Sequence, residues 1–260
     1  MTLYDVIGKT YASTRRSDSR IAEKLLELLA SSQASMIADI GAGAGSYALV
    51  LAECGYRVFA IEPSATMRSQ AIAHPAIEWI NGSADNLPLP NQAVDAVIIM
   101  LAFHHFQDYR QALCEVHRVV GNGQIVLFTY DPAMISSFWL TKYFPSFIQD
   151  VESTFLSIPQ LIDEIQTVVG HVVNVIPFLL PHDLSDSFAA VGWARPELYL
   201  DGSIRNGISS FAKIDTDELD NGLSQLREDL ENGMWDQEYG HLRQRKQYDV
   251  GYRFIHSPAI

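Results

Sequence analysis

Three acidic residues and a glycine-rich turn are the features of this sequence best suited to chemistry. The turn spans residues 39–45 (Asp-Ile-Gly-Ala-Gly-Ala-Gly) and follows a short apolar run, while Glu62 and Asp85 each follow a later one. A strand, a glycine turn and a helix in that order bring backbone N–H groups close to a nucleotide-like ligand. We therefore expect a ligand site at this turn, and the carboxylates decide which ligand it takes.

The spacing of the three glycines differs from that of a dinucleotide site. A dinucleotide site has the pattern G-x-G-x-x-G, whereas Gly41, Gly43 and Gly45 form G-x-G-x-G. The three glycines allow a tight turn, close approach of the backbone to a ligand, and close packing of helix on strand. An NAD-dependent oxidoreductase is an alternative on a similar sheet. The early third glycine argues against it, and so does Asp39, which would repel a pyrophosphate.

The three carboxylates match three parts of S-adenosylmethionine. Asp39, directly before the glycines, would attract an ammonium or a sulfonium group. Glu62 follows the glycines by about twenty residues, where an acid accepts hydrogen bonds from ribose hydroxyls. Asp85 can accept a hydrogen bond from the exocyclic amine of adenine. All three lie at the carboxyl ends of predicted strands, where open α/β sheets bind ligands.

Strands that alternate with helices must position these residues. Apolar runs predict strands over about 35–40, 57–61, 77–80, 94–100 and 124–129, with helical patterns between most of them. The run at 94–100 hardly alternates, which is typical of a central parallel strand covered on both faces. Two further strands are predicted over 172–180 and 248–255. The expected fold class is therefore α/β, with a doubly wound, mostly parallel seven-stranded sheet.

The rest of the chain reads as helical insertions on one sheet. No clean linker divides the sequence, so we expect a single domain. The sheet and its helices form a core over residues 20–130, 171–180 and 248–256. A helical cap or lid is expected over residues 1–19, 131–170 and 183–247.

Composition argues against several classes of partner. The 260 residues include 18 Lys and Arg against 31 Asp and Glu, a net charge of −13 that repels nucleic acid. No apolar run approaches the ~20 residues of a membrane span, and the first residues lack the apolar segment of a signal peptide. Cys54 and Cys114 are not in C-x-x-C spacing, so we expect them to be free and buried. We expect a cytoplasmic protein that binds no metal, nucleic acid or membrane; monomer and homodimer both stay open.

Five ordered motifs resemble class I S-adenosylmethionine-dependent methyltransferases of the type 11 group, which includes ubiquinone/menaquinone and trans-aconitate methyltransferases. The motifs are residues 38–45, 60–67, 82–88, 102–106 and 115–123. The resemblance covers about residues 10–130 and implies a Rossmann-like methyltransferase fold with helical cap insertions. It also implies S-adenosylmethionine as cofactor and direct displacement of its methyl group by a small-molecule acceptor, a metabolite or natural-product intermediate.

The resemblance, together with the glycine turn and its acids, assigns the cofactor site. It implies that Tyr11 and Arg15 belong to an N-terminal lid motif and that Met100 lies beside the methionyl group. The expected cofactor-binding residues are Tyr11, Arg15, Asp39, Gly41, Gly43, Gly45, Glu62, Pro63, Met67, Ala84, Asp85 and Met100.

No residue stands out as a catalytic base, so we expect catalysis by alignment and exclusion of water. His104 is the one candidate base; adjacent residues at a strand end point opposite ways, so His104 and His105 cannot easily chelate one metal ion. The expected substrate contacts are His104, Phe138, Trp139 and Arg205, with core packing or a surface salt bridge as alternatives. The residues leave open the acceptor, its methylated atom (O, N or C), and a non-catalytic S-adenosylmethionine-binding role.

Overall fold

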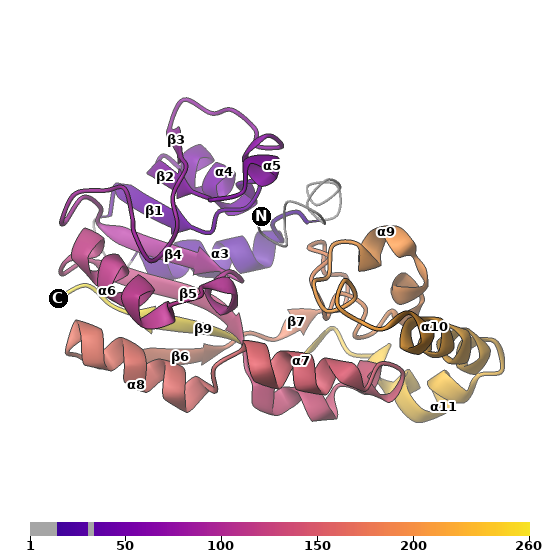
Figure 1. Ribbon diagram of the computed structural model, residues 1–260. Coiled ribbons are helices and arrows are strands. Elements are labelled where there is room, and N and C mark those ends of the chain that lie inside the picture. Colours follow the sequence, from indigo (N-terminus) through magenta and orange to yellow (C-terminus); the bar gives the residue numbers. More distant parts are fainter. Residues whose placement is uncertain (1–14, 31–33) are drawn as a thin grey trace.

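The computed structural model describes residues 15–30 and 34–260, and its centre is a seven-stranded sheet (Figure 1). The strand order is β3-β2-β1-β4-β5-β9-β6. The strands are β1 (Met36–Ile40), β2 (Arg57–Ile61), β3 (Ile77–Ile80), β4 (Ala96–Met100), β5 (Gln124–Tyr130), β6 (Asn174–Pro177) and β9 (Tyr252–Ser257). Strands β1 to β5 pair in parallel, and β9 runs antiparallel between β5 and β6. The predicted doubly wound, mostly parallel sheet is confirmed.

The central strands bury both of their faces, which explains their unbroken apolar runs. In β4, Ala96 and Ile98 pack into the core on one face of the sheet. Val97 and Ile99, the residues between and after them, pack into a second core on the opposite face. Every residue of β4 is buried, as expected for a parallel strand covered on both sides.

Helices cover both faces of the sheet. Helices α3 (Ser19–Leu29) and α4 (Ser46–Glu53) bury their apolar residues in the first core, and α6 (Tyr109–Val120) buries its own in the second. Helix α3 begins after Asp18, whose side chain accepts a hydrogen bond from the Arg20 backbone N–H. Short helices, α5 (Ala65–Arg68) and η2 (Phe103–His105), follow the ends of β2 and β4.

One helix expected in the cap belongs to the sheet layers instead. Helix α8 (Ile158–Val169) lies within the predicted cap segment 131–170. It packs against α6, and its Leu161 and Ile165 are buried in the core on that face of the sheet. The physical reason is its strongly one-sided apolar face, which requires a partner layer to cover it.

The remaining helices gather beyond one end of the sheet (Figure 1). They are η3 (Pro132–Ser137), η4 (Trp139–Lys142), α7 (Ser146–Thr154), η5 (Pro196–Leu200), α9 (Gly202–Arg205), α10 (Thr216–Glu231), α11 (Met234–Tyr239) and η6 (Gly240–Leu242). A small antiparallel pair, β7 (Leu180–Pro181) and β8 (Gln247–Tyr248), lies outside the main sheet. The division of the chain into core and cap stays a prediction.

Some details of the predicted elements were wrong. The strand expected over 172–180 is split between β6 and β7, and residues 182–195 form turns rather than a helix. Gly192 and Pro196 interrupt the helical pattern there. Cys54 and Cys114 are exposed rather than buried. Cys54 lies just after the end of α4, and Cys114 lies in α6. No helix within residues 15–30 and 34–260 combines the length and apolar character needed to cross a membrane.

Candidate functional site

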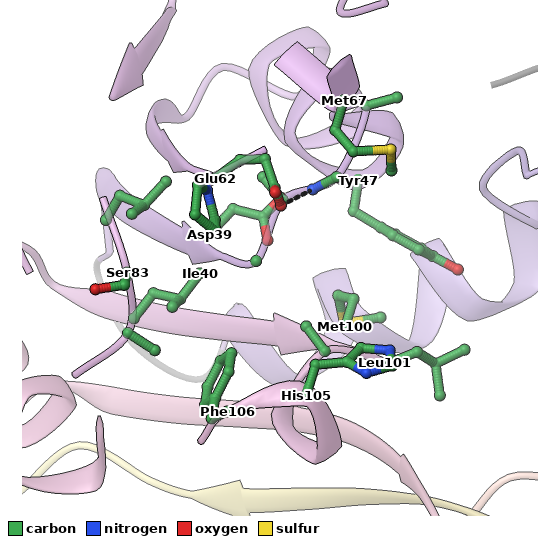
Figure 2. Close-up of a pocket in the computed structure, with 18 of the residues that line it drawn as sticks. Asp39, Ile40, Tyr47, Glu62, Met67, Ser83, Met100, Leu101, His105 and Phe106 are labelled. Atoms are coloured by element: carbon green, nitrogen blue, oxygen red, sulfur yellow. Dashed lines mark hydrogen bonds between the residues drawn. The ribbon is translucent and has the colours of Figure 1, made fainter. Parts of the chain in front are cut away.

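The carboxyl ends of the parallel strands border a cavity of about 600 Å³. This volume lies within the roughly 300–1,000 Å³ typical of small-molecule sites. The glycine turn after β1, Glu62 after β2, residues 82–85 after β3 and residues 100–102 at the end of β4 line it (Figure 2). Because parallel strands end at one edge of the sheet, the topology brings these distant segments together.

Most of the predicted cofactor residues line this first cavity. They are Arg15, Asp39, Gly41, Gly43, Glu62, Pro63, Met67, Ala84, Asp85 and Met100. Gly45 does not line it, and Tyr11 lies outside the described residues. Residues that the sequence did not single out complete the lining, among them Tyr47, Ser83, Leu101, His105, Phe106 and Asp186.

Gly45 has a packing role instead of a place in the cavity. Its φ is +83°, and a Cβ atom built on it would lie 2.5 Å from Cζ2 of Trp79. Gly45 therefore allows the start of α4 to approach the Trp79 side chain of β3, which is the packing task expected of a third glycine. Gly41, with a φ of +73°, is similarly close to Ala102 at the edge of the cavity.

Asp39 and Glu62 place two carboxyl groups next to each other in this cavity (Figure 2). The Glu62 carboxylate accepts hydrogen bonds from the backbone N–H groups of Gly43 (3.0 Å) and Ser64 (2.8 Å). Asp39 is only 2% exposed, and its Oδ1 has no hydrogen-bond partner in residues 15–30 and 34–260. Burial, followed by the charge of Glu62, raises the pKa of Asp39 to about 7.

This environment fits the cationic part of S-adenosylmethionine. A cation beside Asp39 would compensate its buried charge and offset the repulsion from Glu62. Gly41 lets the turn pack closely on Ala102, since a Cβ at Gly41 would clash with that residue. A dinucleotide pyrophosphate would instead add a third negative group to the pair.

Asp186 is a buried acid that sequence reasoning missed. It is 2% exposed and lines the first cavity, and the Arg15 Nε–H donates to its Oδ1 at 2.5 Å. Burial raises the pKa of Asp186. The side chain of Asp18 accepts hydrogen bonds from the backbone and hydroxyl of Ser185, which ties the start of α3 to this segment. No motif marks Asp186, because it lies in a segment that the sequence predicts only as part of the helical cap.

A second, smaller cavity of about 80 Å³ adjoins the first. Arg15 and Leu101 line both cavities, and the wall of the second is mainly apolar and aromatic. Two of the residues predicted as substrate contacts, His104 and Phe138, line it, whereas His105 lines the first cavity. The two histidines lie in the short helix η2 rather than at a strand end. Their rings are 3.9 Å apart instead of pointing opposite ways.

Trp139 and Arg205 line neither cavity, which corrects their expected role in substrate binding. The Trp139 indole N–H donates to the Trp193 carbonyl at 2.9 Å, inside the aromatic core. The Arg205 guanidinium donates to the Tyr199 carbonyl at 2.6 Å. Tryptophan and arginine occur both in binding sites and in structural roles. Here both side chains donate hydrogen bonds to backbone carbonyl groups and so stabilise the fold.

Comparison with known proteins decides the family. Residues 38–128 match the family model of a methyltransferase domain. A solved structure, described as a methyltransferase from an antibiotic biosynthesis pathway of Anabaena variabilis ATCC 29413, is 46% identical. The match covers 94% of this chain and 98% of that one, with a TM-score of 0.90. The chain belongs to the S-adenosylmethionine-dependent methyltransferase family. The family resemblance found in the sequence is thereby confirmed, and the cofactor is S-adenosylmethionine.

Curated relatives of this methyltransferase match over shorter segments. The ubiquinone/menaquinone biosynthesis C-methyltransferase UbiE of Rubrivivax gelatinosus is 36% identical over 89 residues, 34% of this chain and 36% of the relative. The demethylmenaquinone methyltransferase of Thermus thermophilus is 32% identical over 145 residues, 53% of this chain and 65% of the relative. The matched segments thus span less than two thirds of these two relatives.

Proposed function

We propose that this methyltransferase moves a methyl group from S-adenosylmethionine to a small-molecule acceptor by direct displacement. Two adjoining cavities support the proposal most directly. The first is lined by the carboxyl groups of Asp39 and Glu62, and the second by apolar and aromatic side chains. Because Arg15 and Leu101 line both, a cofactor in the first cavity and an acceptor in the second would meet at the wall they share.

In the proposed binding mode, Asp39 faces the cationic groups of the cofactor and Glu62 faces the ribose hydroxyls. Each Glu62 oxygen accepts a hydrogen bond from one backbone N–H, and a carboxylate oxygen can accept a further one from a ribose hydroxyl. The side chain of Asp85 is exposed at the cavity edge, where it can accept from the adenine amine. The residues that would surround the rest of the cofactor are Arg15, Gly41, Gly43, Pro63, Met67, Ala84 and Met100.

Catalysis in this proposal comes mainly from alignment. The sulfonium of the cofactor supplies an electrophilic methyl group, because its sulfur leaves as a neutral thioether. The residues of the chain then have to hold the acceptor in line with the methyl group and exclude water. Phe138, Phe155 and Phe188 line the second cavity and would exclude water from it.

The names of the relatives also favour a small-molecule acceptor. The Anabaena protein is described with an antibiotic biosynthesis pathway, and the Rubrivivax relative with ubiquinone/menaquinone biosynthesis. A protein that only binds S-adenosylmethionine would not need a second, enclosed cavity beside the cofactor. We therefore favour an enzyme over a non-catalytic binding protein.

Calorimetric titration with S-adenosylmethionine tests this proposal. We expect wild-type protein to bind the cofactor, and Glu62→Ala to lose about 1–3 kcal/mol of binding free energy with its hydrogen bonds to the ribose. Glu78→Ala is the matched control, because Glu78 is exposed on β3 and lines neither cavity. Wild-type protein that fails to bind at high micromolar cofactor would contradict the proposal. Unchanged affinity in Glu62→Ala would remove Glu62 from the site.

A further inference from the structure

The second cavity carries two unpaired polar atoms in a mainly apolar wall. His104 Nδ1 and Tyr130 Oη are buried, and neither has a hydrogen-bond partner among residues 15–30 and 34–260. Both residues line the cavity. Because an unpaired buried polar group destabilises a protein, such atoms point to a ligand that pairs with them.

Aromatic contacts connect these two residues and fix their position relative to the first cavity. The His104 ring stacks on Phe155 with 4.1 Å between ring centroids, and Phe155 meets the Tyr130 ring edge-on at 5.9 Å. The His104 ring also lies 3.9 Å from that of His105, which lines the first cavity. A group bound to His104 would therefore lie close to the wall that the two cavities share.

The charges around the second cavity disfavour an ionised acceptor. Among the residues described, Arg15 is the only Lys, Arg, Asp or Glu in its lining, and its guanidinium is paired with Asp186. An aliphatic amine would enter as an ammonium ion and meet no carboxylate in the wall. A carboxylate would lose its hydration among aromatic rings. A neutral hydroxyl group, in contrast, can donate to one unpaired atom and accept from the other.

His104 can accept a hydrogen bond from such a hydroxyl, and then its proton once bonding to the methyl carbon makes that proton strongly acidic. Burial, followed by the charges of His105, Lys213 and Arg15, lowers the pKa of His104 well below its usual value. The imidazole is therefore neutral near pH 7, and in the tautomer that carries its hydrogen on Nε2, the Nδ1 atom is a free acceptor. Tyr130 keeps its hydroxyl hydrogen, because burial raises its pKa.

We infer that the acceptor is an uncharged, mainly apolar molecule whose hydroxyl group binds His104 and Tyr130, with His104 as the catalytic base. The hydroxyl oxygen forms a bond to the methyl carbon while the carbon–sulfur bond breaks and its electron pair stays on sulfur. The hydroxyl proton passes to His104 Nδ1 and later to solvent. The products are a methyl ether and a neutral thioether. This inference rests on the proposed function.

Three ring compounds of similar size test the chemical class of the acceptor. Phenol, benzoate and benzylamine present a neutral, an anionic and a cationic group, respectively. In calorimetry with S-adenosylhomocysteine bound, we expect phenol to bind at least tenfold more tightly than the other two. With methyl-labelled S-adenosylmethionine, we expect label to appear in anisole, detected by mass spectrometry.

Variants test the two residues. Tyr130→Phe and His104→Phe should each weaken phenol binding at least tenfold while S-adenosylmethionine affinity stays within twofold. His104→Asn keeps a hydrogen-bond acceptor without a base, so it should bind phenol within about threefold of wild type but lose anisole formation. Tyr56→Phe and His241→Asn, outside both cavities, are the matched controls. Near-UV circular dichroism verifies that each variant is folded.

Each outcome decides for or against the inference. Benzoate or benzylamine binding as tightly as phenol overturns it, and so does anisole formation by His104→Phe at the wild-type rate. Wild-type protein that binds S-adenosylmethionine but none of the three compounds also overturns it, and leaves the proposed function standing. Failure to bind S-adenosylmethionine would overturn the proposed function itself.

Discussion

Asp39 is the residue whose ionisation depends most on the ligand. Glu62 is held by two backbone N–H groups, whereas Asp39 Oδ1 has no hydrogen-bond partner in the described part of the chain. Burial and the neighbouring Glu62 raise the pKa of Asp39 to about 7. A cation next to Asp39 would favour its charged form, so cofactor binding and ionisation of Asp39 are coupled.

The pH dependence of stability tests this account of Asp39. Its pKa in the folded protein, about 7, lies above the ordinary value of 3.8, so the folded state holds a proton that the unfolded state releases. The resulting stability is present below about pH 4 and is lost as pH rises to about 7, by at most about 1.4 kcal/mol per pH unit. Asp39→Asn should remove this loss. Urea unfolding of both proteins without cofactor at pH 5 and pH 8 measures it; parallel pH profiles would contradict the assignment.

At this scale the sequence predicted the residues that belong to motifs and missed those that do not. Asp39, Glu62 and Asp85 could be predicted because each lies at or after the carboxyl end of a recognisable strand. Asp186 could not, because its place in the cavity depends on the pairing with Arg15, far away in the sequence. Which of the neighbours Phe138 and Trp139 lines the second cavity could not be predicted either. It depends on tertiary packing, which turns Phe138 toward the cavity and Trp139 toward the Trp193 carbonyl.

At the scale of elements, the glycine turn and the start of α4 depend on close packing. Gly45 precedes α4 with a φ of +83°, and the Trp79 ring of β3 lies against it. Gly55, after the same helix, also has a positive φ, +94°, but nothing lies within 4 Å of the position its Cβ would occupy. The two glycines share a left-handed backbone conformation, but only Gly45 has a side chain packed against it. Comparing them therefore separates the cost of backbone strain from the cost of a steric clash.

Alanine substitutions at these glycines should therefore differ in cost. Gly55→Ala should lower the free energy of unfolding by about 1–2 kcal/mol, from the left-handed backbone alone. Gly45→Ala should lose about 1–3 kcal/mol more, because its Cβ would overlap Trp79. Urea unfolding of both variants measures the difference. Equal losses would show that Trp79 moves away at no cost and that Gly45 is not needed for packing.

Element prediction succeeded where periodicity or unbroken apolar runs were strong. Strands β1 to β5 match the predicted runs to within one or two residues, because both faces of each central strand require apolar residues. The position of α8 beside α6 could not be predicted from the apolar periodicity of α8, because an apolar face does not show which element covers it. The helix prediction over residues 182–195 was wrong for a different reason. Most residues from 184 to 194 are buried by tertiary packing, with Trp193 fully enclosed, without forming a regular element.

At the scale of the whole molecule, the site is assembled from distant parts of the chain. Arg15 comes from before α3, Leu101 from the end of β4, and Asp186 from the turns after β7. Sheet topology explains why the motif residues meet, because parallel strands end at one edge. It does not determine the second cavity, whose walls combine Tyr130 of β5 and Tyr252 of β9 with residues of η3, η4, α7 and irregular segments. The cofactor site was therefore more predictable than the acceptor site.

A crystal structure with S-adenosylhomocysteine bound tests the central claim most directly, since it locates the cofactor relative to every residue assigned here. We expect the ribose hydroxyls on Glu62, the amino group beside Asp39, the adenine next to Ala84 and Asp85, and the sulfur facing the wall shared with the second cavity. A ligand bound away from Asp39 and Glu62, or a sulfur that faces away from the second cavity, would contradict the account.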